Sequence, residues 1–232
     1  MDTTLSNNPT QNRILAALSR PVYERLLADL ELVYISVGED IYEPDIPIAY
    51  LYFPVDCIVA CIAELADGAT LLTSMIGQEG MVGISYLLGS EKAPVRAVAL
   101  SGGRALKIKS SALKKEFDSE DKLQRLLLRF TQTLILQTTH IAIGARYDSI
   151  EQQLCGFLLM TLDRLPTNEL HITHQQVSVM LGVRRETITD LSQKLQMTGA
   201  ITSRRGHLTI VDRQELESRT GESYTAANKE YY

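Results

Sequence analysis

The chain has 232 residues, of which 45% are hydrophobic and 22% charged, and its formal net charge is −5 at pH 7. This composition is typical of a globular protein with room for two domains, and it excludes wholesale disorder. The acidic balance excludes a protein that coats nucleic acid through its overall charge, although a global sum can hide a local basic patch.

Neither a membrane span nor a disulfide framework is expected. No apolar run approaches the roughly 20 residues of a membrane helix, and the first residues lack the basic-then-apolar order of a signal peptide, so we expect a cytoplasmic protein. Cys57, Cys61 and Cys155 lie in apolar stretches without paired spacing. Cys57 and Cys61 are four residues apart in a strand-like run, which predicts a shared face and favours burial over metal or redox chemistry.

The amino-terminal part of the chain predicts helices. Residues 1–12 are polar and are expected to be loosely held. Residues 14–30 (ILAALSRPVYERLLADL) have helical spacing that is interrupted once, at Pro21, because proline lacks the N–H that a helix interior needs. We therefore expect a helical entry segment.

From Leu32 to Ile108 the pattern predicts strands. Short apolar or alternating runs are separated by Gly, Pro and Asp: VYISV, AYLYFPV, CIVACIAEL, TLLTSMI, RAVAL and RALKI. Many short strands at turn-rich spacing indicate an all-β barrel, roll or sandwich. Gly77, Gly80 and Gly83 could suggest a phosphate-binding loop, but no strand-to-helix context or lysine follows, so turn glycines are favoured.

From Glu120 the apolar spacing becomes helical. It follows the alternating steps of four and three of a coiled-coil seam, at Leu123, Leu127, Phe130, Leu134, Ile141 and Ala145. This predicts a dimerisation helix over about residues 120–147. Leu126, Ile135 and Leu136 widen the stripe beyond a seam, so the alternative is a core helix that lies on the β domain. Both interpretations could hold at once.

A second helix is predicted directly afterwards. Asp148 and Glu151 fit a capping box, in which two side chains satisfy the free amides of a helix start. The helix carries one apolar face and ends before Pro166. We therefore divide the chain near Tyr147, into residues 1–147 and 148–232, and expect the α+β fold class.

Residues 173–195 (THQQVSVMLGVRRETITDLSQKL) combine two short helical patterns around a Leu-Gly-Val turn. Thr173 can cap the first helix, whose Val177 and Leu181 point inward, and Gly182 permits the backbone of the turn. The second helix runs from about Arg184 and buries Ile188, Leu191 and Leu195. Its opposite face carries Glu186, Thr189, Asp190 and Gln193, with Arg185 on the flank.

A polar helix face with charges at its leading end is what a helix in the DNA major groove requires. Arg185 can donate two hydrogen bonds to guanine and Glu186 can accept one from cytosine, so these two are the predicted base readers. Arg184 and Lys194 are expected to contact phosphate, which positions a protein without reading sequence. The predicted interface also includes Thr173, His174, Thr189, Asp190 and Gln193.

The sequence AITSRRGHLTIV predicts a hairpin wing with a basic tip, whose Arg204, Arg205 and His207 would contact the DNA backbone. Residues 171–211 hold five basic and two acidic residues, a local charge of +3. The alternative is a charged helical hairpin that serves protein assembly. Asp212 with Glu215 predicts a further capped helix that packs against the wing.

These residues resemble a known family. The segment ITHQQVSVMLGVRRETITDL, with Arg185, Glu186 and Thr187, looks like the helix-turn-helix of the Crp/Fnr superfamily of bacterial transcription regulators. The likeness extends through VGEDIYEPDIPIAYLYFPVDC, IGQEGMVGISYLLG and RAVALSGGRALKIK to the long helix. It implies a sensor domain with a double-stranded β-helix or jelly-roll fold, a dimer helix and a winged helix-turn-helix. The implied partners are double-stranded DNA, a second copy, RNA polymerase and a small-molecule effector.

The sequence departs from relatives that bind cyclic AMP, which present a glutamate to the ribose and an Arg-Ser or Arg-Thr pair to the phosphate. Here Ile84 stands at the glutamate position and Ala97 follows Arg96. An isoleucine would leave a ribose hydroxyl unpaired, at a cost of roughly 1–3 kcal/mol, so control by cyclic AMP is not expected. The candidate effector pocket comprises Gly83, Ile84, Ser85, Arg96, Ala97, Gln137 and Thr138.

Two further departures bear on function. Asp190 stands where many relatives have an arginine, so it is expected to alter the DNA half-site by accepting from cytosine or by holding Arg185 or Lys194. No cysteine precedes Cys57 and no histidine precedes His140, which argues against iron–sulfur or haem sensing and against a cupin-like metalloenzyme, the main enzymatic alternative. We expect no metal, cofactor or catalytic activity.

Overall fold

The computed structural model describes residues 11–165, 167–204 and 206–225. The predicted entry segment forms α1 (Arg13–Ala16) and α2 (Arg20–Leu27). Pro21 lies in the first turn of α2, where its missing N–H is tolerated. Asn12 was expected in a loose segment but is fully buried, because its amide donates to the carbonyls of Pro54 (2.9 Å) and Gly80 (2.8 Å).

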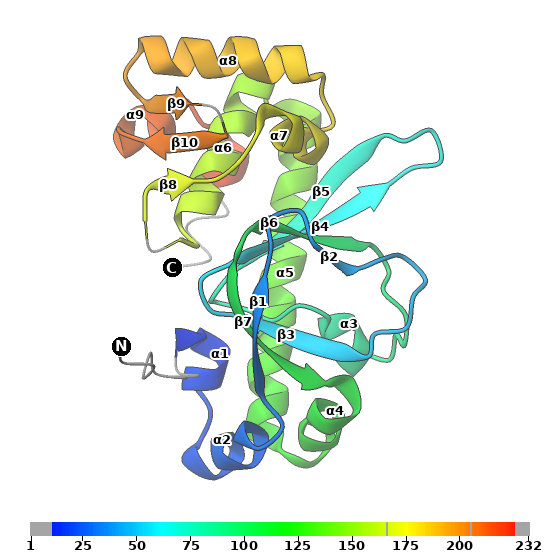
Figure 1. The fold of residues 1–232 in the computed structure, drawn as a ribbon. Helices are drawn as coiled ribbons and strands as arrows, with labels where there is room; N and C mark the ends of the chain where they lie inside the picture. The colour runs from blue at the N-terminus through cyan, green and yellow to red at the C-terminus, as the bar shows by residue number, and fades with distance from the viewer. Residues whose placement is uncertain (1–10, 166, 205, 226–232) are drawn as a thin grey trace.

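Two antiparallel sheets form the predicted β roll (Figure 1). One sheet has the strand order β1-β7-β3 and the other β2-β6-β4-β5. The strands are β1 (Glu31–Ile35), β2 (Asp40–Tyr42), β3 (Tyr50–Pro54), β4 (Ile58–Glu64), β5 (Thr70–Ile76), β6 (Arg96–Ser101) and β7 (Gly103–Lys109). The residues that point into the roll are apolar, as the alternating sequence runs predict.

Two short helices interrupt and close the roll, α3 (Ile84–Leu87) and α4 (Ser110–Ser119). The loop that contains Gly80 leads from β5 into α3, so a strand-to-helix context does exist, contrary to the sequence-based expectation. Gly80 lies against the ring of Phe130, and a Cβ there would collide with it. Close packing therefore accounts for this glycine.

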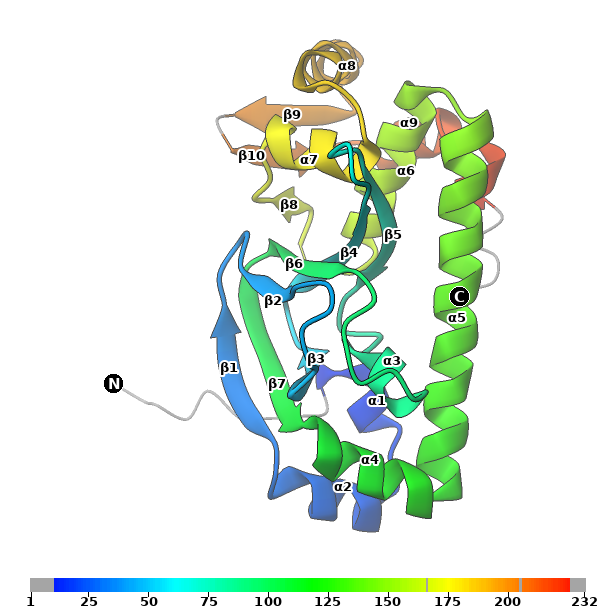
Figure 2. The same ribbon diagram turned by 90° about the vertical axis from the view of Figure 1, so that its right-hand side faces the viewer.

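Helix α5 (Asp121–Tyr147) runs beside the roll for 27 residues, or about 40 Å (Figure 2). Leu123, Leu127 and Phe130, which were predicted to form a dimer seam, are buried against the chain's own roll. The prediction of a seam at these residues is therefore wrong, and the alternative of a core helix on the β domain is correct for this face.

The carboxyl-terminal part begins with α6 (Ile150–Leu162). Its capping box joins Ser149 and Gln152, one residue later than the predicted pair of Asp148 and Glu151. Asp148 instead ends α5, and its carboxylate accepts a hydrogen bond from the Ser223 hydroxyl. Both pairs fit the capping pattern, and Asp148 is committed to the contact with Ser223.

The predicted winged helix-turn-helix follows. It consists of β8 (Glu169–Leu170), α7 (His174–Leu181), α8 (Arg185–Met197), β9 (Ile201–Arg204), β10 (His207–Ile210) and α9 (Arg213–Ser218). Asp212 caps α9 as predicted, by accepting from the Glu215 N–H. However, α9 and the residues after it are tied to α6 by ion pairs, Arg213 to Asp163 (2.6 Å) and Arg219 to Glu151 (3.0 Å). The expectation that this segment packs against the wing is therefore replaced by packing along α6.

One hydrophobic core joins the roll to the carboxyl-terminal elements. Leu72 and Met75 of β5 belong to the same buried cluster as Phe157 of α6, Met180 of α7 and Ile188 of α8. The helix-turn-helix is thus seated on the sheet that contains β5.

The cysteines are core residues. Cys57 packs with Ile35, Ala99 and Ala105, whereas Cys61 lies half-buried against a different cluster, so the predicted shared face is wrong. The pairing of β4 with β6 shifts register between Ile58 and Val59, which lie between the two cysteines. Burial raises the pKa of the Cys57 thiol to about 12, which keeps it protonated.

Within the described part of the chain, no helix is long and apolar enough to cross a membrane. No group of three or more His, Cys, Asp or Glu residues is placed there to hold a metal ion.

Candidate nucleic-acid interface

Helix α7 is fixed at both ends, at its cap and at the turn that leads to α8. Thr173 accepts from the Gln176 N–H (3.2 Å) and its own N–H donates to the Gln176 side chain (2.9 Å), which completes a capping box at the start of α7. Gly182 has a φ of 63°, in the left-handed region, and a Cβ there would stand 2.7 Å from the carbonyl oxygen of Thr70. Backbone conformation and close packing both favour glycine at this corner.

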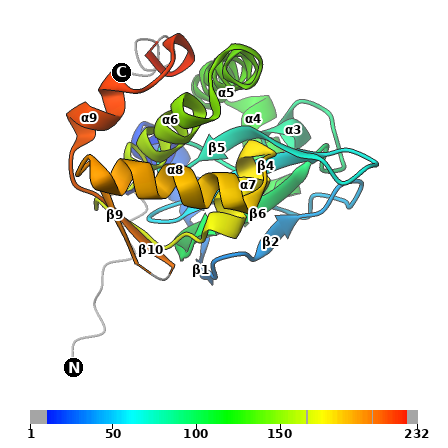
Figure 3. The same cartoon turned by 90° about the horizontal axis from the view of Figure 1, so that it is seen from above.

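Helix α8 presents one face to the core and the opposite face to solvent. Ile188, Leu191 and Leu195 are buried, as predicted. Figure 3 shows α8 lying across the outside of the molecule, with α7 beneath it. The predicted site residues that are exposed are Thr173, Arg184, Arg185, Glu186, Asp190, Gln193, Lys194 and Arg204. The structure therefore brings together most of the residues assigned to DNA contact.

Thr189 and His174 are half-buried and contact each other, with 3.0 Å between the His174 Nδ1 and the Thr189 Oγ1. The Thr189 hydroxyl also lies 3.1 Å from the Arg185 carbonyl, to which it donates. Burial and then the charge of Arg185 lower the pKa of His174, so this imidazole is neutral at pH 7. This contact connects the first turn of α7 to α8.

The wing lies beside α8 and is held to it. Its strands have the order β8-β10-β9, and the Ser203 N–H donates to the Gln196 side chain of α8 (3.1 Å). Arg204 of β9 lies opposite His207 of β10 in the register of the hairpin, and both are exposed. Arg205, predicted at the tip, lies outside the described residues.

Two exposed residues in this region were not assigned from the sequence. The ring of His171 stacks edge-on against that of His207, with centroids 4.1 Å apart. Met197, at the end of α8, is 87% exposed. The His171 contact depends on β8, which is two residues long and carries no periodic signal.

The candidate effector residues fall into two groups. Gly83 lies against Tyr42 and Leu51, Ile84 and Ser85 are half-buried, and Ala97 is buried. Arg96 forms an ion pair with Asp40 (2.6 Å).

Gln137 and Thr138 instead contact β5. The Gln137 side chain accepts from the Met75 N–H (3.0 Å) and donates to the Met75 carbonyl (3.2 Å), while Thr138 donates to the Thr73 carbonyl (2.9 Å). Arg96 and Gln137 thus already interact with other parts of the chain, Arg96 with Asp40 and Gln137 with Met75.

Comparisons with known proteins agree with this architecture. Residues 152–219 match the family of Crp-like helix-turn-helix domains. No curated protein sequence matches the chain.

Three solved structures cover most of the chain. A Crp/Fnr-family protein from Eubacterium rectale is 19% identical, with a TM-score of 0.70 over 90% of this chain and 98% of its own. FixK2 from Bradyrhizobium japonicum is 19% identical, with a TM-score of 0.71 over 83% and 98%. The c-di-GMP-responsive global regulator CLP from Xanthomonas campestris is 21% identical, with a TM-score of 0.65 over 84% and 100%. Identities of this size show a shared fold.

Proposed function

We propose that this chain, which joins a Crp-like helix-turn-helix domain to the fold of Crp/Fnr-family structures, is a dimeric, sequence-specific transcription regulator that acts on DNA in the cytoplasm. The observation that carries the proposal is the exposed polar face of α8, with three charged residues, Arg184, Arg185 and Glu186, at its leading end. A helix of this kind beside a hairpin wing fits the major groove. The regulators that share this fold are not enzymes, and we assign no catalytic role.

The proposed dimer uses the outer face of α5. Leu128 and Ile135 are 46% and 56% exposed, and Ile143 is 41% exposed near the end of the helix. Leu128, Ile135 and Ala142 recur every seven residues, as in a coiled-coil seam, on the side away from the roll. Pairing of two copies along this face would place two α8 helices about 34 Å apart, one turn of DNA, so that the dimer reads a pseudo-palindrome.

Within each half-site, Arg185 and Glu186 read bases, and Arg184, Lys194 and Arg204 contact phosphate. Asp190 lies on the same exposed face as Glu186, one helical turn further on. Two carboxylates on this face favour cytosine amino groups over guanine at the bases they meet.

Regulation is proposed to enter through the sensor part. A ligand or partner that binds one orientation of α5 more tightly than another would shift the population that can dock on DNA. Cyclic AMP is disfavoured because Ile84 cannot pair with a ribose hydroxyl. Contact with RNA polymerase is the proposed route by which the bound dimer alters transcription.

Selection of bound sites from a random pool of duplex DNA tests the proposal. The expected result is an enriched pseudo-palindrome whose half-site centres lie one helical turn apart. Binding to the selected duplex should weaken as salt is raised, because phosphate contacts release counterions. If no sequence is enriched and duplex binding is absent, with or without cell extract, the protein-assembly module becomes the better assignment.

A further inference from the structure

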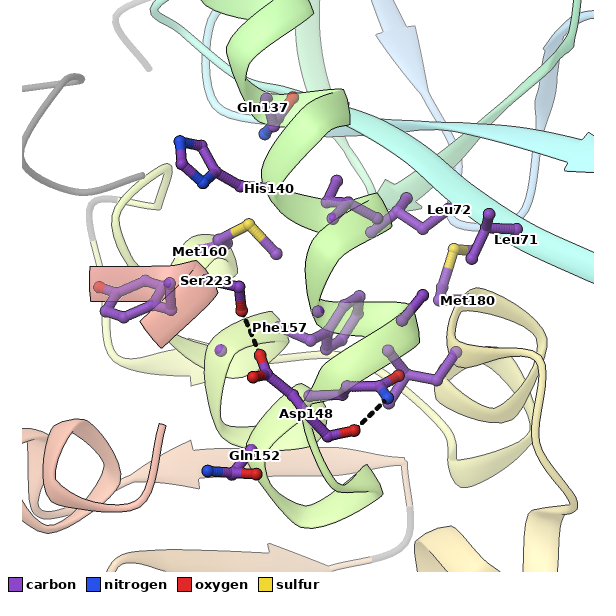
Figure 4. A pocket seen from close by; sticks show the side chains of 17 residues that line it. Leu71, Leu72, Gln137, His140, Asp148, Gln152, Phe157, Met160, Met180 and Ser223 are labelled. Carbon is purple, nitrogen blue, oxygen red and sulfur yellow. Dashed lines mark hydrogen bonds between the residues drawn. The ribbon is translucent and has the colours of Figure 1, made fainter. Parts of the chain in front are cut away.

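A pocket lies where α5, α6 and α7 meet β5 and the residues after α9 (Figure 4). Its empty space is about 590 Å³, including the mouth that opens to solvent. A small molecule therefore fits it better than a bulky one.

The walls of this junction pocket are mainly apolar. They are formed by Leu71, Leu72, Ile141, Phe157, Met160, Met180 and Leu181. In Figure 4 the two methionines stand on different sides of the pocket. Methionine side chains are unbranched and adapt their shape, so the pocket can widen around a ligand without a change of backbone.

Both glycines that stand inside the described α-helices line this pocket, Gly144 in α5 and Gly156 in α6. Glycine weakens a helix relative to alanine, so a packing or functional reason is expected. At Gly156 an added Cβ would meet only Tyr224, at 3.5 Å, which is an ordinary contact. Packing therefore does not demand glycine there, and the missing side chain leaves space that belongs to the pocket.

The charge of the pocket restricts its ligand. Asp148 is the one Asp, Glu, Lys or Arg among the lining residues that the structure describes. Its carboxylate accepts from the Ser223 hydroxyl, and its backbone carbonyl accepts from the Gln153 side chain (2.9 Å). An anionic ligand would meet this carboxylate with no Lys or Arg among the described lining residues to compensate it, whereas an N–H or O–H group could donate to it.

We infer that the junction pocket is a binding site for a small, uncharged and mainly apolar molecule that carries one hydrogen-bond donor. Of the effector residues assigned from the sequence, Gln137 alone lines it. The site is therefore separate from the interior of the roll, and its existence does not depend on the proposed DNA binding.

Indole is a suitable probe because it is small, mainly apolar and uncharged and carries one N–H. The chain contains no tryptophan, so indole fluorescence can be excited selectively and followed during a titration with the full-length protein. We expect saturable binding at one site per chain. Indole-3-acetate, the anionic counterpart, should bind at least about tenfold more weakly because of Asp148. Asp148→Asn should remove most of this difference.

Gly156→Ala provides the structural test. The added methyl group narrows the pocket and should weaken indole binding at least about tenfold, while the melting temperature stays equal or rises because alanine favours the helix. Absence of saturable binding, or equal affinity for indole in Gly156→Ala, overturns the inference. DNA binding is measured separately. If the indole results are as expected and no duplex is bound, the proposed regulator fails and the ligand site stands.

Discussion

Arg185 and Glu186 are neighbours in sequence but lie about 100° apart around α8. Glu186 stands near the centre of the exposed face, together with Asp190 and Gln193, whereas Arg185 stands on the flank close to His174. An arginine on the flank reaches either a base edge or a phosphate. Loss of a base contact changes the sequence preference, whereas loss of a phosphate contact does not.

Arg185→Ala should therefore weaken binding to the selected site by roughly 1–3 kcal/mol and relax the preference at one base pair in each half-site. Competition binding against single-base variants of the site measures both effects. Arg204→Ala is the matched control, since a phosphate contact in the wing should weaken all sequences alike. If both variants bind all the DNA sequences more weakly to the same extent, Arg185 contacts phosphate and not a base.

His174 predicts a pH dependence of stability. Its pKa is lowered in the folded protein, by burial first and then by the charge of Arg185, from an ordinary value of 6.5. The unfolded chain therefore binds a proton at this residue more readily, so His174 lowers the free energy of unfolding as the pH drops below about 6.5 and has little such effect above it.

His174→Gln should reduce this loss, because glutamine cannot take up the proton. Denaturant unfolding of both proteins at pH 7.5 and pH 5.5 measures the difference. An equal loss in the two proteins would show that other groups control the acid sensitivity.

At the scale of elements, α5 shows what periodicity can and cannot predict. The spacing of Leu123, Leu127 and Phe130 correctly predicts a long helix with an apolar stripe, but an intramolecular core and a coiled-coil partner demand the same spacing. Only the position of the roll decides which stripe is covered. The exposed stripe, with Leu128 and Ile135, is weaker in sequence because Gln132 and Thr139 interrupt it.

Ile135→Glu should convert the proposed dimer to a monomer without unfolding the chain, since Ile135 is 56% exposed within one copy. Sedimentation velocity measures the mass, and circular dichroism verifies the helices. Lys122→Glu places the same acidic residue on an exposed part of α5 away from the stripe, and it should remain dimeric. A dimer in both variants would place the interface elsewhere.

Other elements show why some helix boundaries and short strands could not be predicted from the sequence. Ser149 and Asp148 both satisfy the capping pattern, and only the contact of Asp148 with Ser223, which is 75 residues away in sequence, selects between them. Strands β2 and β8 have three and two residues, too few for an alternation to be recognised. By contrast, Thr173 and Gly182 were predictable because capping and left-handed turns have local residue preferences.

At the scale of the whole molecule, the helix-turn-helix is bound to the roll by more than the chain connection. The Thr70 hydroxyl donates to the Val179 carbonyl of α7 (2.6 Å), and Arg164 at the end of α6 pairs with Glu79 (2.8 Å). These polar contacts flank the shared apolar core, in which Leu72 is 2% exposed. The boundary near Tyr147 thus stays a prediction from sequence, although α5 does end there.

A shared core predicts that the chain unfolds as one cooperative unit. Leu72→Ala should lower the free energy of unfolding by roughly 2–5 kcal/mol. Tyrosine fluorescence and far-ultraviolet circular dichroism should report the same single unfolding transition, and Leu72→Ala should shift it equally for both probes. Leu65→Ala, at a residue that is 63% exposed, should change little. Two separate transitions, with one unaffected by Leu72→Ala, would show independent domains.

The same seating of Phe157 and Met180 on β5 constrains protein engineering. A hybrid that grafts residues 148–232 onto an unrelated sensor would leave this apolar underside uncovered and prone to aggregation, unless the new sensor offers a matching sheet. Successful exchange would then require transplanting β4 and β5 together with residues 148–232, so the segment that can be exchanged differs from the one that the chain order suggests.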